Sequence, residues 1–206
     1  AFNLSTTADA PTGSWQAVVK AGGATFYKSL KIETIKPNRL KIELDFKKDR
    51  LTALDDNISG DLNVKWLHGA TAGGLKAEYE MIVSPVKTTF EDFPSFIFDD
   101  ESKYFYAESQ EVFSGRLDAN GFAKVNLDLN MENNSPGALR ATFSGKVYEE
   151  GGNFSIDQVS IPYYPYTSFV GLKAPEGDKR GMLLTDEDHN IRIVTVNAKG
   201  QPVNRR

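Results

Sequence analysis

Two histidines are the first residues to consider for chemistry, because histidine can act as a general base or as a metal ligand near neutral pH. His68 stands directly before a glycine-rich stretch, and His189 lies in the polar run Asp186–Asn190. A His-x-x-x-His or His-Glu pair at ligand spacing is absent. We therefore predict a corner position for His68, a surface position for His189, and no catalytic or metal-binding role for either.

Three short acidic runs are the next candidates: Asp55–Asp56, Asp99–Glu101 and Glu149–Glu150. Two carboxylates at a fixed separation can hydrolyse a glycosidic bond, and several together can bind calcium. Nothing in the sequence fixes the separation of these runs, and each lies in a predicted loop, where charge is expected. Solvated loop charge is the preferred interpretation, with calcium binding and catalysis as alternatives.

The stretch Asp118–Gly121 resembles the first positions of a calcium-binding loop. Such a loop requires a glutamate six residues after its glycine, and Leu127 occupies that position. A nucleophile elbow, a Walker loop and a dinucleotide-binding glycine motif are also absent. The sequence therefore offers no catalytic, cofactor-binding or metal-binding residue, and we predict a protein that is not an enzyme and uses no cofactor.

Composition narrows the range of partners. The 206 residues carry a net charge of −4 with dispersed Lys and Arg, so no basic surface for nucleic acid is expected. No apolar run is long enough to predict direct membrane insertion. Cysteine is absent, which excludes disulfides and thiolate chemistry but leaves the compartment undecided. The sequence starts at Ala1 without a signal peptide, and we interpret it as a piece of a longer protein.

The elements that would position these residues are β-strands. In Ile58–Val83, Leu62, Val64 and Trp66 alternate with polar residues, which is the pattern of a half-buried strand. The small residues of Gly69–Gly74 then predict a tight corner before a second strand. We expect Trp66 to lie in the core.

Similar alternation predicts further strands along most of the chain. Gly22 and Gly23 indicate a tight hairpin turn near the start, and Asp118–Gly121 indicates another in the middle. Breaks are expected at Pro37 and at Pro162–Tyr166. The strands are expected within residues 14–19, 25–35, 39–46, 58–66, 75–83, 113–117, 122–127, 138–148, 154–161, 169–172 and 191–196. Short strands at this spacing predict an all-β antiparallel sandwich.

Two aromatic groups leave alternatives open. The stretch Ser84–Gln110 is rich in Phe and Tyr without a period, and we expect it to pin its rings over the sandwich edge, with a ligand-binding platform as the alternative. Tyr163, Tyr164 and Tyr166 could stack on sugar rings or on a partner protein. Packing between domains is the preferred interpretation for them.

Three segments together resemble the bacterial α2-macroglobulin family. Leu30–Ile42 is similar to the junction between two macroglobulin-like domains, Trp66–Leu75 is similar to the strand corner of such a domain, and Tyr166–Lys173 is similar to the start of the following one. The resemblance extends over nearly the whole chain. It implies an immunoglobulin-like or macroglobulin-like β-sandwich.

The resemblance also implies a domain organisation. Residues 37–165 would form one complete macroglobulin-like domain, residues 1–36 the C-terminal strands of a preceding domain, and residues 166–206 the N-terminal strands of a following domain. Each flank would be incomplete, so strand exchange within the chain or dimer contacts between two molecules are expected to cover the exposed edges.

The function implied by the resemblance is that of a non-catalytic scaffold segment in a protease-trapping protein, an endopeptidase inhibitor. Its partners would be proteases, bound through the full-length parent. The parent would be periplasmic or at the cell surface, with a lipoprotein anchor at an N-terminus outside this sequence. The family's thioester cannot be transferred, since the chain has no cysteine. The alternative is a carbohydrate- or protein-binding β-sandwich module of an exported enzyme.

Overall fold

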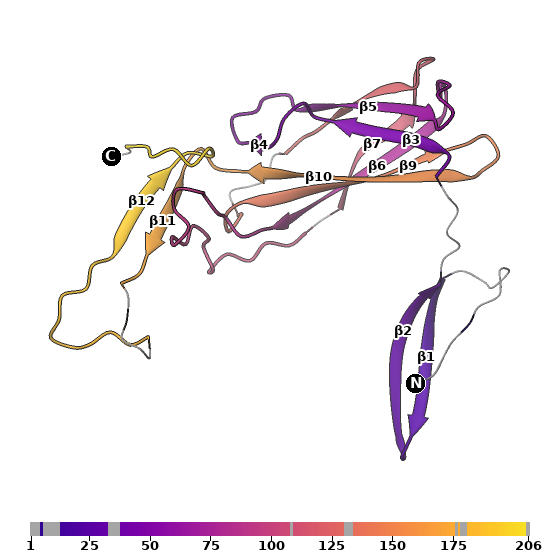
Figure 1. Ribbon diagram of the computed structural model, residues 1–206. Coiled ribbons are helices and arrows are strands. Elements are labelled where there is room, and N and C mark those ends of the chain that lie inside the picture. Colours follow the sequence, from indigo (N-terminus) through magenta and orange to yellow (C-terminus); the bar gives the residue numbers. More distant parts are fainter. Residues whose placement is uncertain are drawn as a thin grey trace. The chain divides into compact units, whose positions relative to one another are not determined.

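The fold is taken from a computed structural model that describes residues 5, 13–32, 38–107, 109–129, 134–175, 177 and 181–204. Within these residues every helix or strand assigned is a β-strand (Figure 1). The strands are β1 (Gly13–Ala21), β2 (Ala24–Ile32), β3 (Leu40–Asp45), β4 (Leu51–Thr52), β5 (Ser59–Trp66), β6 (Lys76–Pro85), β7 (Ser109–Arg116), β8 (Phe122–Asn126), β9 (Leu139–Tyr148), β10 (Phe154–Tyr164), β11 (Phe169–Lys173) and β12 (Arg192–Val196).

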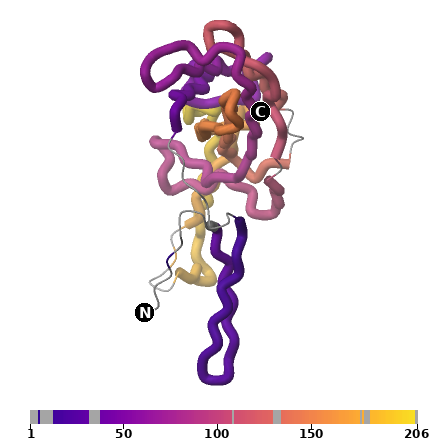
Figure 2. The backbone as a smooth tube through the Cα atoms, turned by 90° about the vertical axis from the view of Figure 1, so that its right-hand side faces the viewer, coloured from indigo at the N-terminus to yellow at the C-terminus, as the bar shows by residue number. Residues whose placement is uncertain are grey.

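The chain divides into two compact units, Ala1–Asn38 and Arg39–Arg206. The first contains the antiparallel hairpin of β1 and β2, which Figure 2 traces as a long two-stranded ribbon. Its turn places Gly22 at φ 58° and Gly23 at φ 80°, a left-handed conformation that glycine adopts without steric cost. The hairpin predicted from this glycine pair is confirmed.

The second unit contains two layers of strands, antiparallel except for the short strand β4, which pairs with β10 in parallel. One sheet has the order β4-β10-β9-β6-β7, and the other has the order β3-β5-β8. Buried and exposed residues alternate along β3, β6 and β9, because successive side chains of a strand point to opposite faces. The predicted all-β sandwich is therefore confirmed. We call the buried side chains between the two sheets the main core.

Three residues in one row across the larger sheet explain how the polar side chain of Tyr79 is accommodated in the main core. Tyr79 on β6 pairs with Gly145 on β9, which pairs with Asp157 on β10. A Cβ atom at Gly145 would lie 2.1 Å from Cζ of Tyr79, so the tyrosine ring lies directly over the glycine. The ring reaches across the middle strand, and Tyr79 Oη donates a hydrogen bond to Asp157 Oδ2 at 3.0 Å. Burial, together with the negative charge of Asp157, raises the pKa of Tyr79.

The glycine corner forms as the sequence predicts, with one correction. Gly69 and Gly74 take positive φ, and a Cβ atom at Gly73 would lie 2.5 Å from the carbonyl oxygen of Ala119. The corner therefore packs against the turn between β7 and β8. Trp66 was expected in the core, but it is only partly buried and packs at the rim of the main core. Its ring lies at the end of β5, where Arg39 lies over it with Cζ 5.4 Å from the ring centroid.

Two further differences concern chain breaks. Pro162 and the two tyrosines after it, expected to form a linker, belong to β10, and Tyr163 and Tyr164 pair in parallel with the short strand β4. Proline is tolerated there because β10 has no neighbouring strand on its β4 side before Tyr163. The break expected at Pro37 lies outside the described residues, as do residues 131–133 of the polar loop before β9.

Candidate functional site

The two histidines lie on the surface and have separate neighbours. The His68 ring is exposed and stacks on Trp66 with 6.1 Å between ring centroids. His189 is exposed, and its Nε2 donates to the carbonyl oxygen of Leu184 at 2.8 Å. Among the residues that the structure describes, no group of three or more His, Asp or Glu side chains is arranged to hold a metal ion.

Asp55 and Asp100 of two acidic runs bond within their own loops, whereas Glu149 of the third run pairs with the distant Arg39 at 2.8 Å. Asp55 forms an ion pair with Lys48 and accepts hydrogen bonds from Thr52. Burial works against its charge, but the bonds from Lys48 and Thr52 outweigh burial and lower the pKa of Asp55. Asp100 accepts two bonds from Ser102, which lower its pKa in the same way. These carboxylates stay ionised and cap turns, which is opposite to what a general acid needs.

The calcium-like stretch is a turn whose acidic group is already occupied. Asp118 Oδ1 accepts hydrogen bonds from the backbone N–H groups of Asn120 and Phe122, both at 2.8 Å. Gly121 sits at φ 79°, as the tight turn requires. The turn predicted at this position is confirmed.

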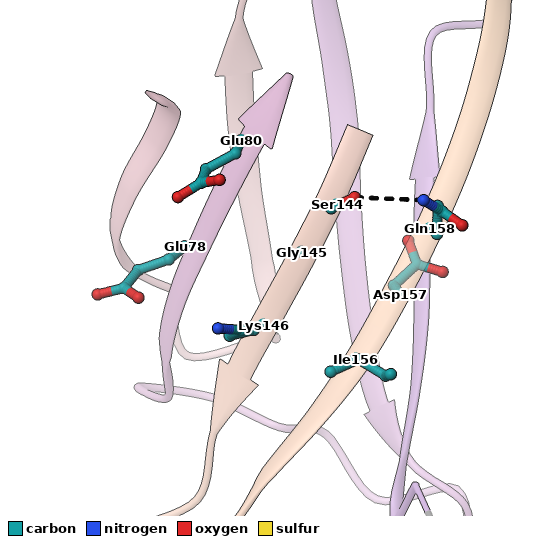
Figure 3. Close-up of a pocket in the computed structure, with 8 residues that line it drawn as sticks. All are labelled: Glu78, Glu80, Ser144, Gly145, Lys146, Ile156, Asp157 and Gln158. Carbon is teal, nitrogen blue, oxygen red and sulfur yellow. Dashed lines mark hydrogen bonds between the residues drawn. The ribbon is translucent and has the colours of Figure 1, made fainter. Parts of the chain in front are cut away.

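A shallow hollow of about 340 Å³ lies on the outer face of the larger sheet (Figure 3). Glu78 and Glu80 of β6 stand on one side of it, and residues of β10 stand on the other. In between, Gln158 Nε2 donates to Ser144 Oγ at 3.4 Å. Its lining residues are Glu78, Glu80, Ser144, Gly145, Lys146, Ile156, Asp157 and Gln158.

The carboxylates of this hollow are not arranged for catalysis. Glu78 accepts bonds from Lys76 at 2.6 Å and from Tyr148 Oη at 2.7 Å, and these bonds lower the pKa of Glu78. A carboxylate held ionised in this way cannot deliver a proton near neutral pH. Glu80 accepts a bond from Ser109 Oγ at 3.2 Å. The lining includes no histidine or cysteine that could serve as a nucleophile or base.

The three tyrosines near Pro162 pack against other side chains instead of forming an exposed platform. Tyr163 is buried, and its Oη donates to the carbonyl oxygen of Leu129 at 3.3 Å. Tyr164 packs edge-on against Phe169 with 5.5 Å between ring centroids. Tyr166 also packs on Phe169, and its Oη donates to the carbonyl oxygen of Ser135 at 2.6 Å. These contacts show that the three side chains pack within the described chain, with Tyr163 in the main core, and packing between domains stays a prediction.

Phe169 belongs to a second buried cluster, separate from the main core, which we call the aromatic junction. It joins the excursion of residues 86–107 to the two-stranded ribbon of β11 and β12. The Phe90 ring lies 4.7 Å from the Phe98 ring and 5.7 Å from the Phe169 ring, between centroids. The four buried members are Phe90, Phe98, Phe169 and Val196.

Backbone contacts hold the ribbon to the excursion at the same place. Ile97 and Leu172 exchange two N–H···O=C bonds, of 2.8 and 2.9 Å. Gly171, the residue before Leu172, lies against the Phe98 ring. A Cβ atom at Gly171 would lie 2.4 Å from Phe98, so only glycine leaves room for this ring. The prediction that this segment packs its rings over the sandwich edge is therefore incomplete, because its most buried rings pack against the ribbon of β11 and β12.

The excursion is also tied to the sandwich. The Thr88 side chain is 1% exposed, and its hydroxyl donates to Asp99 Oδ1. The same hydroxyl accepts the N–H of Ala138 at 2.7 Å, one residue before β9 begins. A Cβ atom at Gly137 would collide with both Thr88 and Asp99. The excursion is thus fixed at the base of β9 by hydrogen bonds and at the ribbon by aromatic packing.

Two sheets packed around a mostly aliphatic core, with an added aromatic junction, define an all-β sandwich domain. Residues 38–165 match the family model of the bacterial alpha-2-macroglobulin MG5 domain, and the chain belongs to that family. In the described part of the chain, no helix is long and apolar enough to cross a membrane.

Known relatives agree with this assignment. The chain is 24% identical over 187 residues to an alpha-2-macroglobulin homolog of Yersinia pestis, covering 86% of this chain and 9% of that protein. The native conformation of Escherichia coli alpha-2-macroglobulin has a TM-score of 0.61 and 19% identity, covering 94% of this chain and 13% of that one. E. coli alpha-2-macroglobulin activated by porcine elastase has a TM-score of 0.57 and 21% identity, covering 92% and 17%. The chain thus spans a small part of the length of these relatives.

Proposed function

We propose that this chain is a non-catalytic scaffold segment of a bacterial alpha-2-macroglobulin-like protein that traps proteases. The MG5 match over residues 38–165 supports the family context, and the E. coli relative activated by porcine elastase supports proteases as partners of the parent. The observation that carries the proposal is the aromatic junction. Its buried rings supply no reactive group, and they hold the ribbon of β11 and β12 against the excursion of residues 86–107.

The proposal includes a domain organisation. Residues 37–165 would be the complete macroglobulin-like domain, residues 1–36 the last strands of a preceding domain, and residues 166–206 the first strands of a following one. Large apolar side chains on both flanks support it, because they lie 47–68% exposed where a completed domain would cover them. They are Trp15, Val18, Val19, Phe26 and Tyr27 on the hairpin and Val170, Leu172 and Ile193 on the ribbon.

In this proposal the parent works in the periplasm or at the cell surface, held by a lipid anchor on its N-terminus. Proteases contact the full-length parent and not this segment alone. The alternative function, a carbohydrate- or protein-binding module, relied on Tyr163, Tyr164 and Tyr166 as stacking residues. Tyr163 is 5% exposed and the other two are partly covered, so their packing favours the scaffold.

The flanks also support contacts between copies of the isolated chain. A two-stranded hairpin is marginally stable alone in water, and the exposed side chains of β1 and β2 would gain burial by pairing with a second copy. Thermal unfolding at several protein concentrations tests this: the melting temperature of a dimer rises with concentration. A monomer by sedimentation, with a melt independent of concentration, would contradict it.

The scaffold role is tested in the full-length parent. Elastase is incubated with the parent, and its activity is followed on a small peptide and on a large protein substrate. A trapped protease keeps the first activity and loses the second. We expect Phe98→Ala, which weakens the aromatic junction, to reduce the trapped fraction, and Ile97→Ala, whose side chain is 56% exposed, to leave it unchanged.

The same assay includes the isolated chain as a control. The chain should neither inhibit elastase nor hydrolyse either substrate, because a scaffold acts only within the assembled parent. Inhibition by the isolated chain, or an unchanged trapped fraction in the Phe98→Ala parent, would contradict the proposal.

A further inference from the structure

The end of the excursion carries a pair of aromatic side chains that nothing in the described chain covers. Tyr104 is 79% exposed and Tyr106 is 82% exposed, whereas Phe105 between them packs against the main core. This alternation is the period of an extended strand, in which every second side chain points to the same side. In an extended segment, side chains two residues apart, such as those of Tyr104 and Tyr106, point to the same side and are spaced about 7 Å along it.

The backbone of the same segment has no partner. Within the part of the chain that the structure describes, the N–H and C=O groups of Tyr104–Ala107 make no hydrogen bond. Two residues after Ala107, β7 begins at Ser109 and is paired with β6. An extended stretch of unpaired backbone beside a sheet is a template on which another strand can pair.

The surrounding sequence is strongly acidic. Between Glu91 and Glu111 there are seven carboxylates and one basic residue, Lys103, in a chain whose net charge is only −4. Lys103 is engaged elsewhere: its Nζ lies 5.4 Å from the centroid of the Tyr166 ring and donates to Tyr166 Oη at 3.2 Å. The excursion therefore presents net negative charge along the chain that carries the exposed tyrosines.

We propose that Tyr104–Ala107 is a docking strip for an extended, basic segment of another polypeptide. The unpaired N–H and C=O groups match the backbone of an added strand, a recognised mode of peptide binding. The two tyrosines pack against alternate side chains of that strand, since tyrosine combines a large apolar surface with a polar end. Lysine or arginine in the partner complements the acidic excursion.

Other ligand classes fit this strip less well. A nucleic acid would be repelled by the carboxylates, since such binding depends on cationic contacts to phosphate. A sugar could stack on the rings but would leave the row of backbone donors and acceptors without matching groups. A polypeptide uses all three features at once.

The probe is a synthetic octapeptide of alternating Arg and Val, titrated into the isolated chain and followed by calorimetry and by backbone amide NMR signals. We expect saturable binding that weakens with added salt and shifts the signals of residues 104–107. The double variant Tyr104→Ser and Tyr106→Ser should bind about tenfold more weakly, as expected for exposed aromatic anchors. Tyr27→Ser, which removes another exposed tyrosine, should bind normally.

A second arm changes the peptide and leaves the protein intact. The same octapeptide, N-methylated at alternate residues, keeps its charge but loses half of its backbone donors, and it should bind at least about tenfold more weakly. The proposal is overturned if the plain peptide does not bind, or if the methylated peptide or the double variant binds equally well. Self-association of the chain through the strip, seen by sedimentation and abolished in the double variant, would overturn the basic partner. Neither arm involves protease trapping, so the outcome is independent of the scaffold role.

Discussion

The main core and the aromatic junction are both buried clusters, but they are built from different residues and from different kinds of segment. The main core takes mostly aliphatic side chains from alternate positions of two sheets. The junction has four buried members, three of them phenylalanines, and two of those come from a segment without regular structure. Removal of one side chain takes away only part of the packing of a large core. In the small junction, it can remove the contact that holds the ribbon to the excursion.

The two regions also differ in what depends on them. Sheets of five and three strands meet at the main core, so its packing stabilises the whole domain. The junction supports a two-stranded ribbon, which would be marginal without it. A substitution in the main core should therefore act globally, and one in the junction should act locally. The predictions below test this difference.

The largest effect is expected from Phe143→Ala in the main core. The Phe143 side chain is fully buried, and its ring lies 4.7 Å from that of Phe46 across the two sheets. Removing it should lower the free energy of unfolding by about 3–5 kcal/mol, measured by urea denaturation. Phe154→Ala is the matched control, since that ring is 47% exposed on β10. Equal losses in the two variants would contradict the assignment of Phe143 to the core.

A smaller and local effect is expected from Phe98→Ala in the junction. This ring is 6% exposed and packs on Phe90 and against Gly171. Its loss should lower the free energy that holds β11 and β12 against the excursion by about 2–3 kcal/mol, without unfolding the sandwich. Hydrogen exchange should accelerate at the paired amides of the ribbon and stay unchanged in β9. Uniform acceleration in both would mean that the junction and the main core unfold as one unit.

The same contrast explains how far the sequence could predict the fold. The burial of alternating residues such as Leu62 and Val64 can be predicted from their immediate neighbours in the sequence, and most strands and both glycine turns follow from such patterns. The short strand β4, Leu51–Thr52, escapes because two residues contain no period, and its partners Tyr163 and Tyr164 lie more than a hundred residues away.

The junction was only half visible in the sequence, for the same physical reason. The aromatic density of Ser84–Gln110 predicts that these rings cover another part of the chain, but no periodicity connects Phe90 to Phe169, whose ring centroids lie 5.7 Å apart. That contact depends on where β10 directs the chain, which is a tertiary property. The prediction that Trp66 lies in the core is wrong for another reason. Trp66 follows the alternation of buried residues, but β5 ends at this residue, and the alternation does not show where a sheet ends.

An intermediate effect is expected when a polar contact of the main core is removed. In Tyr79→Phe the ring still covers Gly145, but the hydrogen bond to Asp157 is lost. The free energy of unfolding should fall by about 1–2 kcal/mol, as for a partly buried acceptor left without its donor. Denaturant melts of this variant and of the control Tyr27→Phe measure it. A loss as large as that in Phe143→Ala would show that the polar contact, and not the packing, dominates this part of the core.

The smallest effect is expected on the outer face of the smaller sheet, where Asp61 on the middle strand β5 lies between two lysines. Ion pairs with Lys124 and then with Lys47, each with its Nζ 2.5 Å from a carboxylate oxygen, lower the pKa of Asp61. Because the folded state holds the carboxylate ionised more strongly than the unfolded chain does, this contribution to stability is complete above about pH 4, the ordinary pKa of aspartate. It is lost as the pH falls below that value and the carboxylate takes up a proton.

Asp61→Asn should therefore be less stable than the parent chain at pH 7, and the difference should narrow toward pH 3. Denaturant melts at pH 7, 5 and 3 measure the difference, and added salt should reduce it at pH 7, since the pairs lie near solvent. Glu43→Gln is the matched control: its partner Lys41 lies at 2.7 Å, but both side chains are more than half exposed, so a smaller difference is expected. A difference for Asp61→Asn that persists unchanged at pH 3 would mean that the side chain stabilises the smaller sheet by packing and not by its charge, as the side chains of the main core do.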